Sequence, residues 1–357
     1  MANPFEHVAG QREPAVPMEP VVDPAGWYPD QITATETWRY VLNDAEIAEI
    51  DVAVAAVEER GFDIVDITRD DFPLPTFGEA IDSMRQELHE GVGFVQIRGM
   101  PVDRWTKAQS AAAYWGVGTY LGRALSQNAN GDLLGHIKDL GGDYSDPITR
   151  GYLTNSRMGF HADQCDYVVL LCLQQARSGG ASRIASSVTV YNEMLKQCPD
   201  LVPELIAPSH WTLHGEISPG EKPWYDLAVF NFHAGYFTAK GASSHIMKSQ
   251  AVPGVPKYSA KRLEAFDKFR EIAEQVSVRV EVLPGDINVL HNHVVLHSRD
   301  AFEDWPEAER KRHLYRLWLN DDAHARRMPS VFRENIQGIW VKGVTPHAQV
   351  DVVNEIS

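Results

Sequence analysis

Apolar residues recur at helical spacing in the first third of the chain. One series ends before Gly61 and the next before Gly91: Ile47, Ile50, Val54 and Val57, then Phe77, Ile81, Met84 and Leu88. Asn43 followed by Glu46 can cap the first of these helices. Residues 106–122 predict a third helix, whereas 93–99 alternate between apolar and polar positions as a strand does. The pattern predicts a helical N-terminal layer that includes one strand.

From about residue 150 the pattern changes to short apolar runs separated by glycine, proline and asparagine, which is typical of β-strands. These runs lie at 167–173, 182–186, 228–237, 278–283, 286–291 and 312–319. Residues 258–276 interrupt them with a helical pattern. We expect this helix to belong to an insertion between strands, around residues 205–277. The expected fold is mainly β with flanking helices.

Residues 1–30 have a different character from the rest of the chain. They carry proline at positions 4, 14, 17, 20, 24 and 29 and show no apolar period. We expect an extended N-terminal arm that can lie against the body. The remaining residues, 31–357, are expected to form a single domain, for which this length and a hydrophobic fraction of 44% are sufficient.

Charge and cysteine content narrow the classes of partner and compartment. A net charge of −16 argues against nucleic-acid and anionic-membrane partners, because both require a basic face. No stretch reaches the roughly 18 consecutive apolar residues of a membrane-spanning helix. The three cysteines show no paired spacing, which favours a reduced, cytoplasmic setting. The composition therefore predicts an intracellular protein in which positive charge matters only at local sites.

The segment GFHADQ contains the first candidate for metal chemistry. Residues two apart on a strand point to the same side, so His161 and Asp163 could bind one ion. This spacing arises easily by chance, and a third ligand is needed. His291, His293 and His297 are all available and all share the same parity, so alternation alone does not choose among them.

The segment RKRHLYRLWL indicates an anion site. As a strand it places Arg312 and Arg316 on one face with Leu314 and Trp318. Arginine on an apolar face is unfavourable without a partner. An internal salt bridge would account for one arginine on this face. Two arginines on the same face favour a site that binds anions.

The order of these motifs resembles the taurine dioxygenase (TauD/TfdA) group of Fe(II)- and 2-oxoglutarate-dependent oxygenases. The resemblance covers roughly the last 200 residues. It consists of HADQ from 161, GGAS from 179, GDINVLHNHVVLH over 285–297 and RHLYR over 312–316. It implies a double-stranded β-helix core of the jelly-roll, cupin-like type, with a lid insertion between core strands.

The resemblance also implies a role for individual residues. His297 would complete an iron site with His161 and Asp163, the facial arrangement that leaves positions open for 2-oxoglutarate and O2. Arg312 and Ser182 would hold the distal carboxylate of 2-oxoglutarate. Arg316 would meet an acidic group of the substrate.

Two positions depart from the commoner family pattern. Serine replaces threonine at 182, which keeps the hydroxyl, and Phe160 stands where tryptophan is often found. The polar loop at 126–136 offers Gln127 and Asn130 as further substrate contacts. Residues 210–237 lie where the family carries a lid, although aromatic residues of this kind usually pack in a core. We expect His291 and His293 to be core or supporting histidines and Cys165 a packed thiol.

The expected activity is oxidation of an unactivated C–H bond of a small, anionic or amino-acid-like molecule, with release of succinate and CO2. Because related halogenases lack the carboxylate, Asp163 favours hydroxylation, desaturation, cyclisation or oxidative cleavage. Two alternatives stay open: the same chemistry on a peptide or protein, and a cupin-type metal or ligand-binding protein that is not an oxygenase. A homo-oligomer is expected only because members of this family commonly form them.

Overall fold

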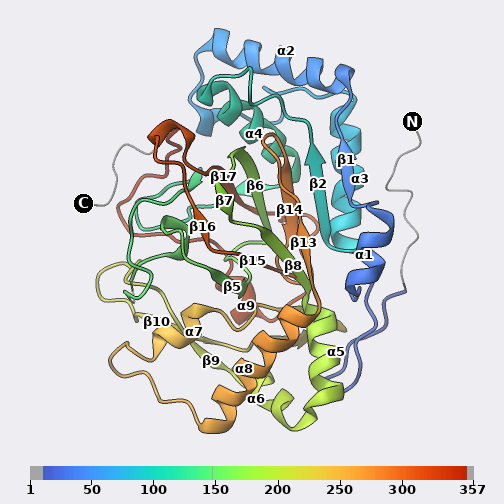
Figure 1. Cartoon of the computed structure of the whole chain (residues 1–357), viewed down its shortest axis with the longest axis vertical. Helices are drawn as coiled ribbons and strands as arrows, with labels where there is room; N and C mark the ends of the chain where they lie inside the picture. The colour runs from blue at the N-terminus through green and yellow to red at the C-terminus, as the bar shows by residue number, and fades with distance from the viewer. Residues whose placement is uncertain (1–10, 147, 352–357) are drawn as a thin grey trace.

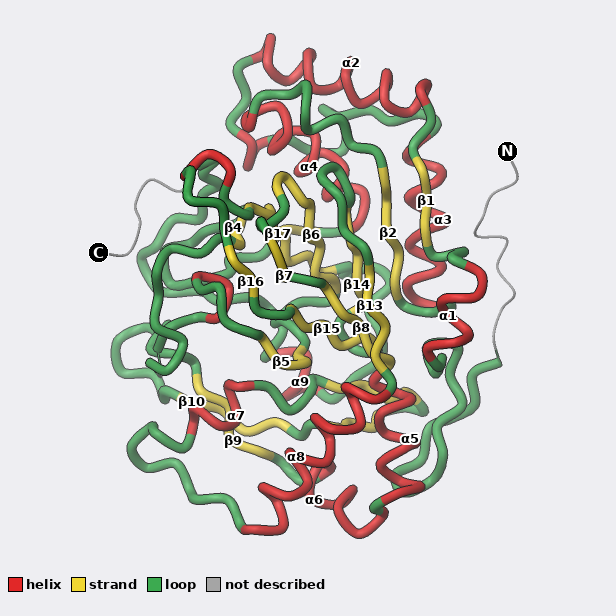
Figure 2. The backbone as a smooth tube through the Cα atoms, viewed as in Figure 1, coloured by secondary structure: helices red, strands yellow, loops and turns green. Residues whose placement is uncertain are grey.

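Two β-sheets form the centre of the molecule, and helices cover the outside (Figures 1 and 2). The structure is a computed structural model, and it describes residues 11–146 and 148–351. The larger sheet has the order β1 (Arg39–Val41), β2 (Phe94–Arg98), β14 (Ile287–His291), β6 (Tyr167–Gln174), β17 (His313–Asn320) and β3 (Arg123–Ala124), and β4 (Gly135–Ile137) also pairs with β17. The smaller sheet has the order β13 (Ser277–Val280), β8 (Ser182–Ser186), β15 (Val295–Arg299) and β5 (Met158–His161). The predicted mainly β core is confirmed.

The N-terminal helices pack on the outer face of the larger sheet. They are α2 (Asp44–Arg60), α3 (Phe77–Glu90) and α4 (Lys107–Leu121). The Asn43 side chain accepts from the backbone N–H of Ala45 and Glu46, and the Glu46 carboxylate accepts from the backbone N–H of Asn43. This capping box starts α2 where the sequence predicts.

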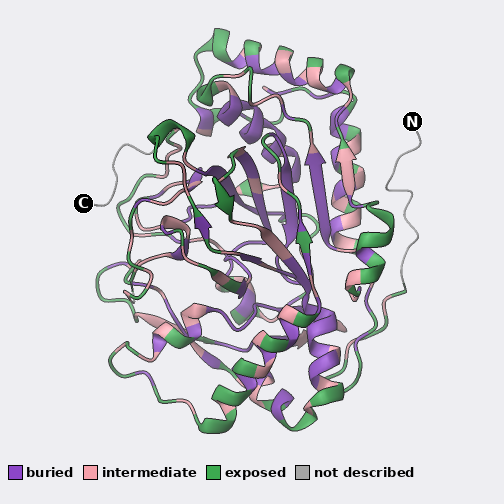
Figure 3. Ribbon diagram, viewed as in Figure 1, coloured by how far each residue is buried: buried purple, intermediate pink, exposed green. Residues whose placement is uncertain are grey.

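Alternation along β17 decides which side chains reach the space between the sheets. Tyr315, Leu317 and Leu319 point outward into the core shared with the N-terminal helices. Trp318 points inward and packs with residues of the smaller sheet. Arg316 therefore lies on the inner side of this strand, in the buried centre of the molecule that Figure 3 shows.

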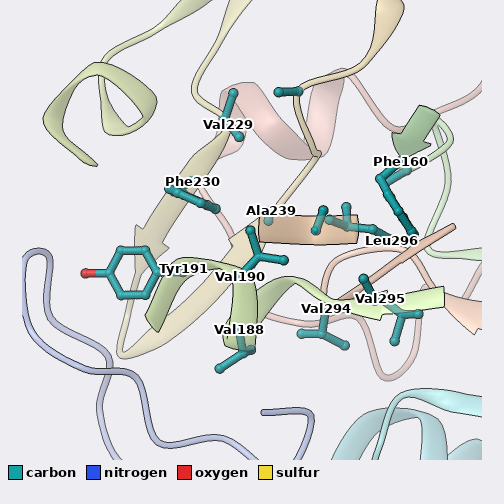
Figure 4. Packing of buried hydrophobic residues seen from close by; sticks show 14 of the residues in the cluster. Phe160, Val188, Val190, Tyr191, Val229, Phe230, Ala239, Val294, Val295 and Leu296 are labelled. Atoms are coloured by element: carbon teal, nitrogen blue, oxygen red, sulfur yellow. The ribbon is translucent and has the colours of Figure 1, made fainter. Parts of the chain in front are cut away.

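A long segment connects two strands that pair with each other, β8 and β13, with Ser277 opposite Ala185. It contains α5 (Ser187–Gln197), η3 (Pro199–Leu201), α6 (Val202–Ile206), β9 (Ser209–Thr212), β10 (Trp224–Leu227), β11 (Phe230–His233), β12 (Tyr236–Ala239), α7 (Ser244–Ser249) and α8 (Ala260–Gln275). In Figure 4, Val190 and Tyr191 of α5 pack beside Phe230, and Leu296 of β15 lies in the same cluster. The connecting segment thus shares a hydrophobic core with the smaller sheet.

One strand prediction in this segment is wrong. Residues 228–237 form the hairpin β11–β12 rather than a single strand. The chain reverses at Ala234 and Gly235, which both have positive φ, 48° and 81°. A tight turn with two left-handed residues matches the twist of the paired strands, and a continuous apolar run hides it.

The proline-rich start of the chain lies against the body. Residues 1–10 of the predicted arm are outside the described residues. In the described part, Val21, Ala25 and Trp27 are buried, and the Trp27 indole donates to the Val92 carbonyl at 2.9 Å. Asp23 forms ion pairs with Arg12 and with the buried Arg326. The arm is therefore packed, and α1 (Pro29–Thr35) follows it.

The remaining elements are short. They are η1 (Ile64–Asp66), η2 (Gly151–Leu153), β7 (Ser178–Gly179), β16 (Phe302–Glu303), η4 (Ala308–Arg310) and α9 (Ser330–Glu334). Among the helices of the described ranges, none combines the length and apolar character that crossing a bilayer requires.

Candidate functional site

Strand pairing brings together three side chains that are far apart in sequence. His161 ends β5 and lies directly opposite His297 of β15, with ring centroids 4.2 Å apart. Asp163 follows β5, with its Oδ1 3.9 Å from Nε2 of His161 and its Oδ2 4.0 Å from Nε2 of His297. Each residue offers one ligand atom within 4.8 Å of the other two. This cluster could hold one metal ion with two nitrogens and one oxygen.

Neighbouring groups orient the three side chains. The Nδ1–H of His161 donates to the Gly159 carbonyl at 2.9 Å, which leaves its Nε2 free to bind a metal. Asp163 Oδ2 accepts from the Trp318 indole at 2.8 Å, and the Asp163 backbone N–H donates to Asn292 Oδ1 at 3.3 Å. Such supporting contacts fix ligand geometry before a metal binds.

The electrostatic surroundings keep all three groups in the form that binds metal. Burial lowers the pKa of His161, and burial together with the neighbouring His161 lowers the pKa of His297 to about 3. Burial alone would raise the pKa of Asp163, but Arg316 and the two imidazoles hold that pKa below its usual range. The cluster therefore presents two neutral imidazoles and one carboxylate at neutral pH.

A pocket beside the cluster contains two arginines with unsatisfied donors. Arg312 and Arg299 line it together with Ser182 and His297. Nη1 of Arg312, and Nε and Nη1 of Arg299, are buried without a hydrogen-bond partner among the described residues. Burial lowers the pKa of Arg312, and burial with the charge of Arg312 lowers the pKa of Arg299 to about 9. Buried guanidinium groups of this kind could bind the carboxylate of a ligand.

Arg316 differs from Arg312, because its guanidinium has partners inside the protein. Its Nε donates to Gln127 Oε1 at 2.7 Å, and its Nη1 lies 3.4 Å from Asp163 Oδ2. The Gln127 amide donates to the carbonyls of Leu133 and Arg316. Arg316 lines the cavity at the cluster but holds Asp163, so the internal salt bridge considered from the sequence is present here.

The structure does not bring the two predicted loop residues to the cluster as substrate contacts. Both polar atoms of the Gln127 side chain have partners inside the protein: the oxygen accepts from the Arg316 guanidinium, and the nitrogen donates to the carbonyls of Leu133 and Arg316. Asn130 is exposed in a turn, where its backbone N–H donates to Asn128 Oδ1. The Gln127 amide therefore has its partners inside the protein, whereas Asn130 lies at the surface.

The other histidines of the 285–297 motif have different roles. His293 is buried and its Nε2 lies 2.7 Å from Asp166 Oδ1. His291 is buried at the end of β14, away from the ligand cluster. Cys165 is a packed thiol, and Asn292 donates to its sulfur at 3.0 Å.

Sequence reasoning missed several residues of this region. Arg299 is two positions after His297 on β15 and shares its parity, so the strand pattern could have identified it. Trp318 is two positions after Arg316 on β17, so the strand pattern could also have placed it on the side of the cluster, where it contacts Asp163. Arg150 and Lys248 line the cavity at the cluster from non-strand segments, and no periodic signal identifies them.

Comparisons with known proteins agree on one family and one fold. A family model described as taurine catabolism dioxygenase TauD, TfdA family matches residues 60–318. The chain is 34% identical over 313 residues to FR-33289 synthase of Streptomyces rubellomurinus, covering 85% of this chain and 91% of that protein. It is 30% identical over 320 residues to taurine hydroxylase-like protein SAT17 of Stachybotrys chartarum, covering 86% and 81%.

Two solved structures share the fold. An asparagine oxygenase in complex with Fe(II), 2S,3S-3-hydroxyasparagine and succinate superposes with a TM-score of 0.61 at 17% identity, covering 82% of this chain and 99% of that chain. The non-heme iron oxygenase OrfP in complex with Fe, succinate and (3S)-hydroxy-L-Arg gives a TM-score of 0.59 at 13% identity, with the same coverage. The expected double-stranded β-helix is confirmed.

Proposed function

Because the chain belongs to the taurine catabolism dioxygenase TauD, TfdA family, whose members use Fe(II), 2-oxoglutarate and O2, we propose specific roles for its residues. His161, Asp163 and His297 hold Fe(II), and Arg312 with Ser182 holds the far carboxylate of 2-oxoglutarate. The protein then oxidises an unactivated C–H bond of a small anionic or amino-acid-like molecule. Family membership makes it an oxygenase and removes the hypothesis of a non-oxygenase cupin.

The observation that carries this proposal is the position of the ligand cluster beside unsatisfied arginine donors. The donor set of two neutral imidazoles and one carboxylate suits ferrous iron and leaves one face open. The pocket of Arg312 and Ser182 is also lined by His161 and His297. One ligand could therefore contact Arg312 at one end and the metal bound by the histidines at the other. Attachment of the co-substrate at two points fixes its orientation.

Arg299 adds a second positive group to the co-substrate pocket. Its Nη2 donates to the Thr154 carbonyl at 2.8 Å, which fixes the side chain while leaving Nε and Nη1 without partners among the described residues. A carboxylate has two oxygens and can accept from two guanidinium groups. We assign Arg299 the role of supporting Arg312 at the distal carboxylate.

When bound, iron supplies the oxygen activation that the side chains cannot perform. The chain's own residues hold the metal, orient the keto acid and exclude water. Trp318 and Arg316 keep Asp163 in place, and the cavity next to the cluster has a volume of about 40 Å³. A small molecule suits this narrow space better than a peptide, which would require an open groove.

Anaerobic titration with Fe(II) and then 2-oxoglutarate tests the assignment. The wild-type protein should develop a visible charge-transfer band, whereas His297→Ala should not. His233→Gln is a suitable control because His233 is an exposed histidine on β11. A normal band in His297→Ala, or none in the wild type, contradicts the proposed metal site. Product mass in turnover assays then separates hydroxylation from desaturation and cyclisation.

A further inference from the structure

Gln127 is buried against Arg316, the arginine that contacts the proposed iron ligand Asp163. We propose that Gln127 is a positioning residue for the metal site: it restrains the Arg316 guanidinium, so that one oxygen of Asp163 stays available to the metal. This inference rests on the proposed function, because it concerns the same metal ligands. It gives Gln127 a role other than the substrate contact that the sequence predicts.

The two oxygens of the Asp163 carboxylate have different surroundings. Oδ2 accepts from the Trp318 indole at 2.8 Å and from Nη1 of Arg316 at 3.4 Å. Oδ1 has no hydrogen-bond donor within the described residues, and it lies 3.9 Å from Nε2 of His161. Donors that gather on one oxygen of a carboxylate leave the other oxygen to bind a metal. Oδ1 is therefore the atom that we assign to the metal.

The contact between Arg316 and Asp163 is longer than these two side chains normally make. A guanidinium and a carboxylate usually form hydrogen bonds of about 2.7–2.9 Å, and they often pair through two parallel bonds that use both oxygens. Here Nη1 of Arg316 reaches Asp163 at 3.4 Å. Both side chains are buried, so a closer pair would be strong. A pair through both oxygens would also occupy the oxygen that the metal needs.

Gln127 explains why the closer pair does not form. Its Oε1 accepts from Nε of Arg316 at 2.7 Å, and its amide nitrogen donates to the carbonyls of Leu133 at 2.9 Å and of Arg316 at 2.8 Å. A buried amide with all of these partners is held rigidly. Because the guanidinium is planar, a hydrogen bond at Nε limits where its other nitrogens can lie. Gln127 therefore keeps Arg316 from closing on Asp163.

A glycine on the neighbouring strand makes room for the Gln127 amide. Gly135 of β4 lies opposite Arg316 of β17 in the register of the two strands. A Cβ atom on Gly135 would lie 2.4 Å from Oε1 of Gln127 and 3.0 Å from its Cδ. Gly135 does not have a positive φ, so its backbone suits alanine. Gly135→Ala should therefore act by displacing the Gln127 amide from Arg316.

Calorimetric titration of the metal-free full chain with Co(II) tests the inference, because Co(II) binds the same nitrogen and oxygen ligands as Fe(II). Gln127→Leu and Gly135→Ala should each weaken Co(II) binding about 10-fold, since the released guanidinium pairs with both oxygens of Asp163. Gln127→Glu loses the same N–H donors as Gln127→Leu but keeps an acceptor for Nε of Arg316. Its Co(II) affinity should stay within about 3-fold of the wild-type value.

Removal of Arg316 separates positioning from a general structural role. In an Arg316→Met background no guanidinium can pair with Asp163. Adding Gln127→Leu or Gly135→Ala to this background should therefore change the Co(II) affinity by less than about 2-fold. If Gln127 only supported the local structure, its loss would weaken Co(II) binding in both backgrounds. Non-additivity thus identifies an effect that passes through Arg316.

Gln96→Leu is the matched control for the loss of a buried glutamine. Gln96 on β2 is also buried, and its Oε1 accepts from Nε of Arg39 at 2.9 Å. Its amide nitrogen donates to the Glu281 carbonyl and to Asn288 Oδ1. Strands β14 and β6 separate β2 from β17 in the larger sheet. Gln96→Leu should lower the melting temperature about as much as Gln127→Leu does, without changing the Co(II) affinity.

The results separate this inference from the proposed function. Wild-type Co(II) affinity in Gln127→Leu and Gly135→Ala, or an equal loss in the Arg316→Met background, overturns the inference. An equal loss in Gln127→Glu and Gln127→Leu also overturns it. If Gln127→Leu does not fold, Gly135→Ala still decides, because it keeps the glutamine. His297→Ala tests the metal site itself: if it binds Co(II) as the wild type does, the metal assignment fails and this inference fails with it. If His297→Ala loses Co(II) but the Gln127 and Gly135 variants do not, only this inference fails.

Discussion

Replacement of Arg312 by methionine should remove function without removing stability. The Arg312 side chain is 5% exposed, and its Nη1 has no partner within the described chain. Methionine has a similar length and can fill the same space. Since an unpaired buried charge costs free energy, its loss should leave the free energy of unfolding unchanged or raise it by about 1 kcal/mol.

The same change should weaken 2-oxoglutarate binding. A hydrogen bond between charged groups contributes about 1.5–3 kcal/mol, which corresponds to roughly 10- to 150-fold in affinity. Arg299 remains in the pocket, so we expect a rise within this range rather than complete loss. The KM for 2-oxoglutarate, measured by succinate release, reports the change, and metal binding should be unaffected.

Arg326→Met is the matched control for Arg312→Met. Arg326 is also 5% exposed, but its guanidinium pairs with the buried carboxylate of Asp23. Removing one partner of a buried pair costs about 3–5 kcal/mol, and we expect the lower end because Arg12 still contacts Asp23. Urea unfolding of both variants tests the contrast. A large loss of stability in Arg312→Met with an unchanged KM would refute a ligand-binding role for this arginine.

Three further changes test other parts of the structure. Trp318→Phe removes the donor to Asp163 and should weaken Fe(II) binding about 10- to 100-fold in metal titrations. Asp23 has a pKa held low by two arginines against the effect of burial, so its contribution to stability is complete above about pH 4 and is lost at lower pH. Asp23→Asn should flatten this acid dependence in urea unfolding. His291→Leu should increase the free energy of unfolding by about 1 kcal/mol and therefore raise the melting temperature, because both ring nitrogens of His291 are buried without partners in the described structure.

Each of these expectations has a contradicting result. Unchanged iron affinity in Trp318→Phe means that the indole does not support the ligand. Parallel acid unfolding curves for wild type and Asp23→Asn exclude the carboxylate as the source of the acid sensitivity. A lower melting temperature in His291→Leu shows that the imidazole has partners in solution.

Strand periodicity predicted the parts of the site that lie on strands. The strand pattern pairs His161, the last residue of β5, with Asp163 just beyond it, and it groups Arg316 of β17 with Arg312, which precedes that strand; Arg312 and Arg316 line one pocket. Parity failed for the distal histidine. The chain turns between β14, which ends at His291, and β15, which begins at Val295, so alternation does not continue from one to the other. Only the resemblance to the family selected His297.

The partners of the two arginines could not be predicted from the strand that carries them. Arg316 meets Gln127, which comes from a loop 189 residues away, and the inward face alone does not show this contact. Arg312 lines the same pocket as Arg316, yet its Nη1 is buried without a hydrogen-bond partner among the described residues. Burial, charge and periodicity were equal for both, and only the three-dimensional arrangement separates a structural arginine from one available to a ligand.

This distinction explains why the chemistry is easier to predict than the substrate. The proposed metal ligands and the proposed co-substrate pocket lie mainly on or next to β5, β8, β15 and β17, whose register fixes the side chains relative to one another. The cavity at the cluster is also lined by Arg150 and Lys248, which lie on a loop and on the short helix α7. Loops and short helices lack a long period and tolerate change, so the same sheets can serve different substrates. The substrate is therefore better sought from the side chains that these segments place in the cavity than from the motif that identifies the family.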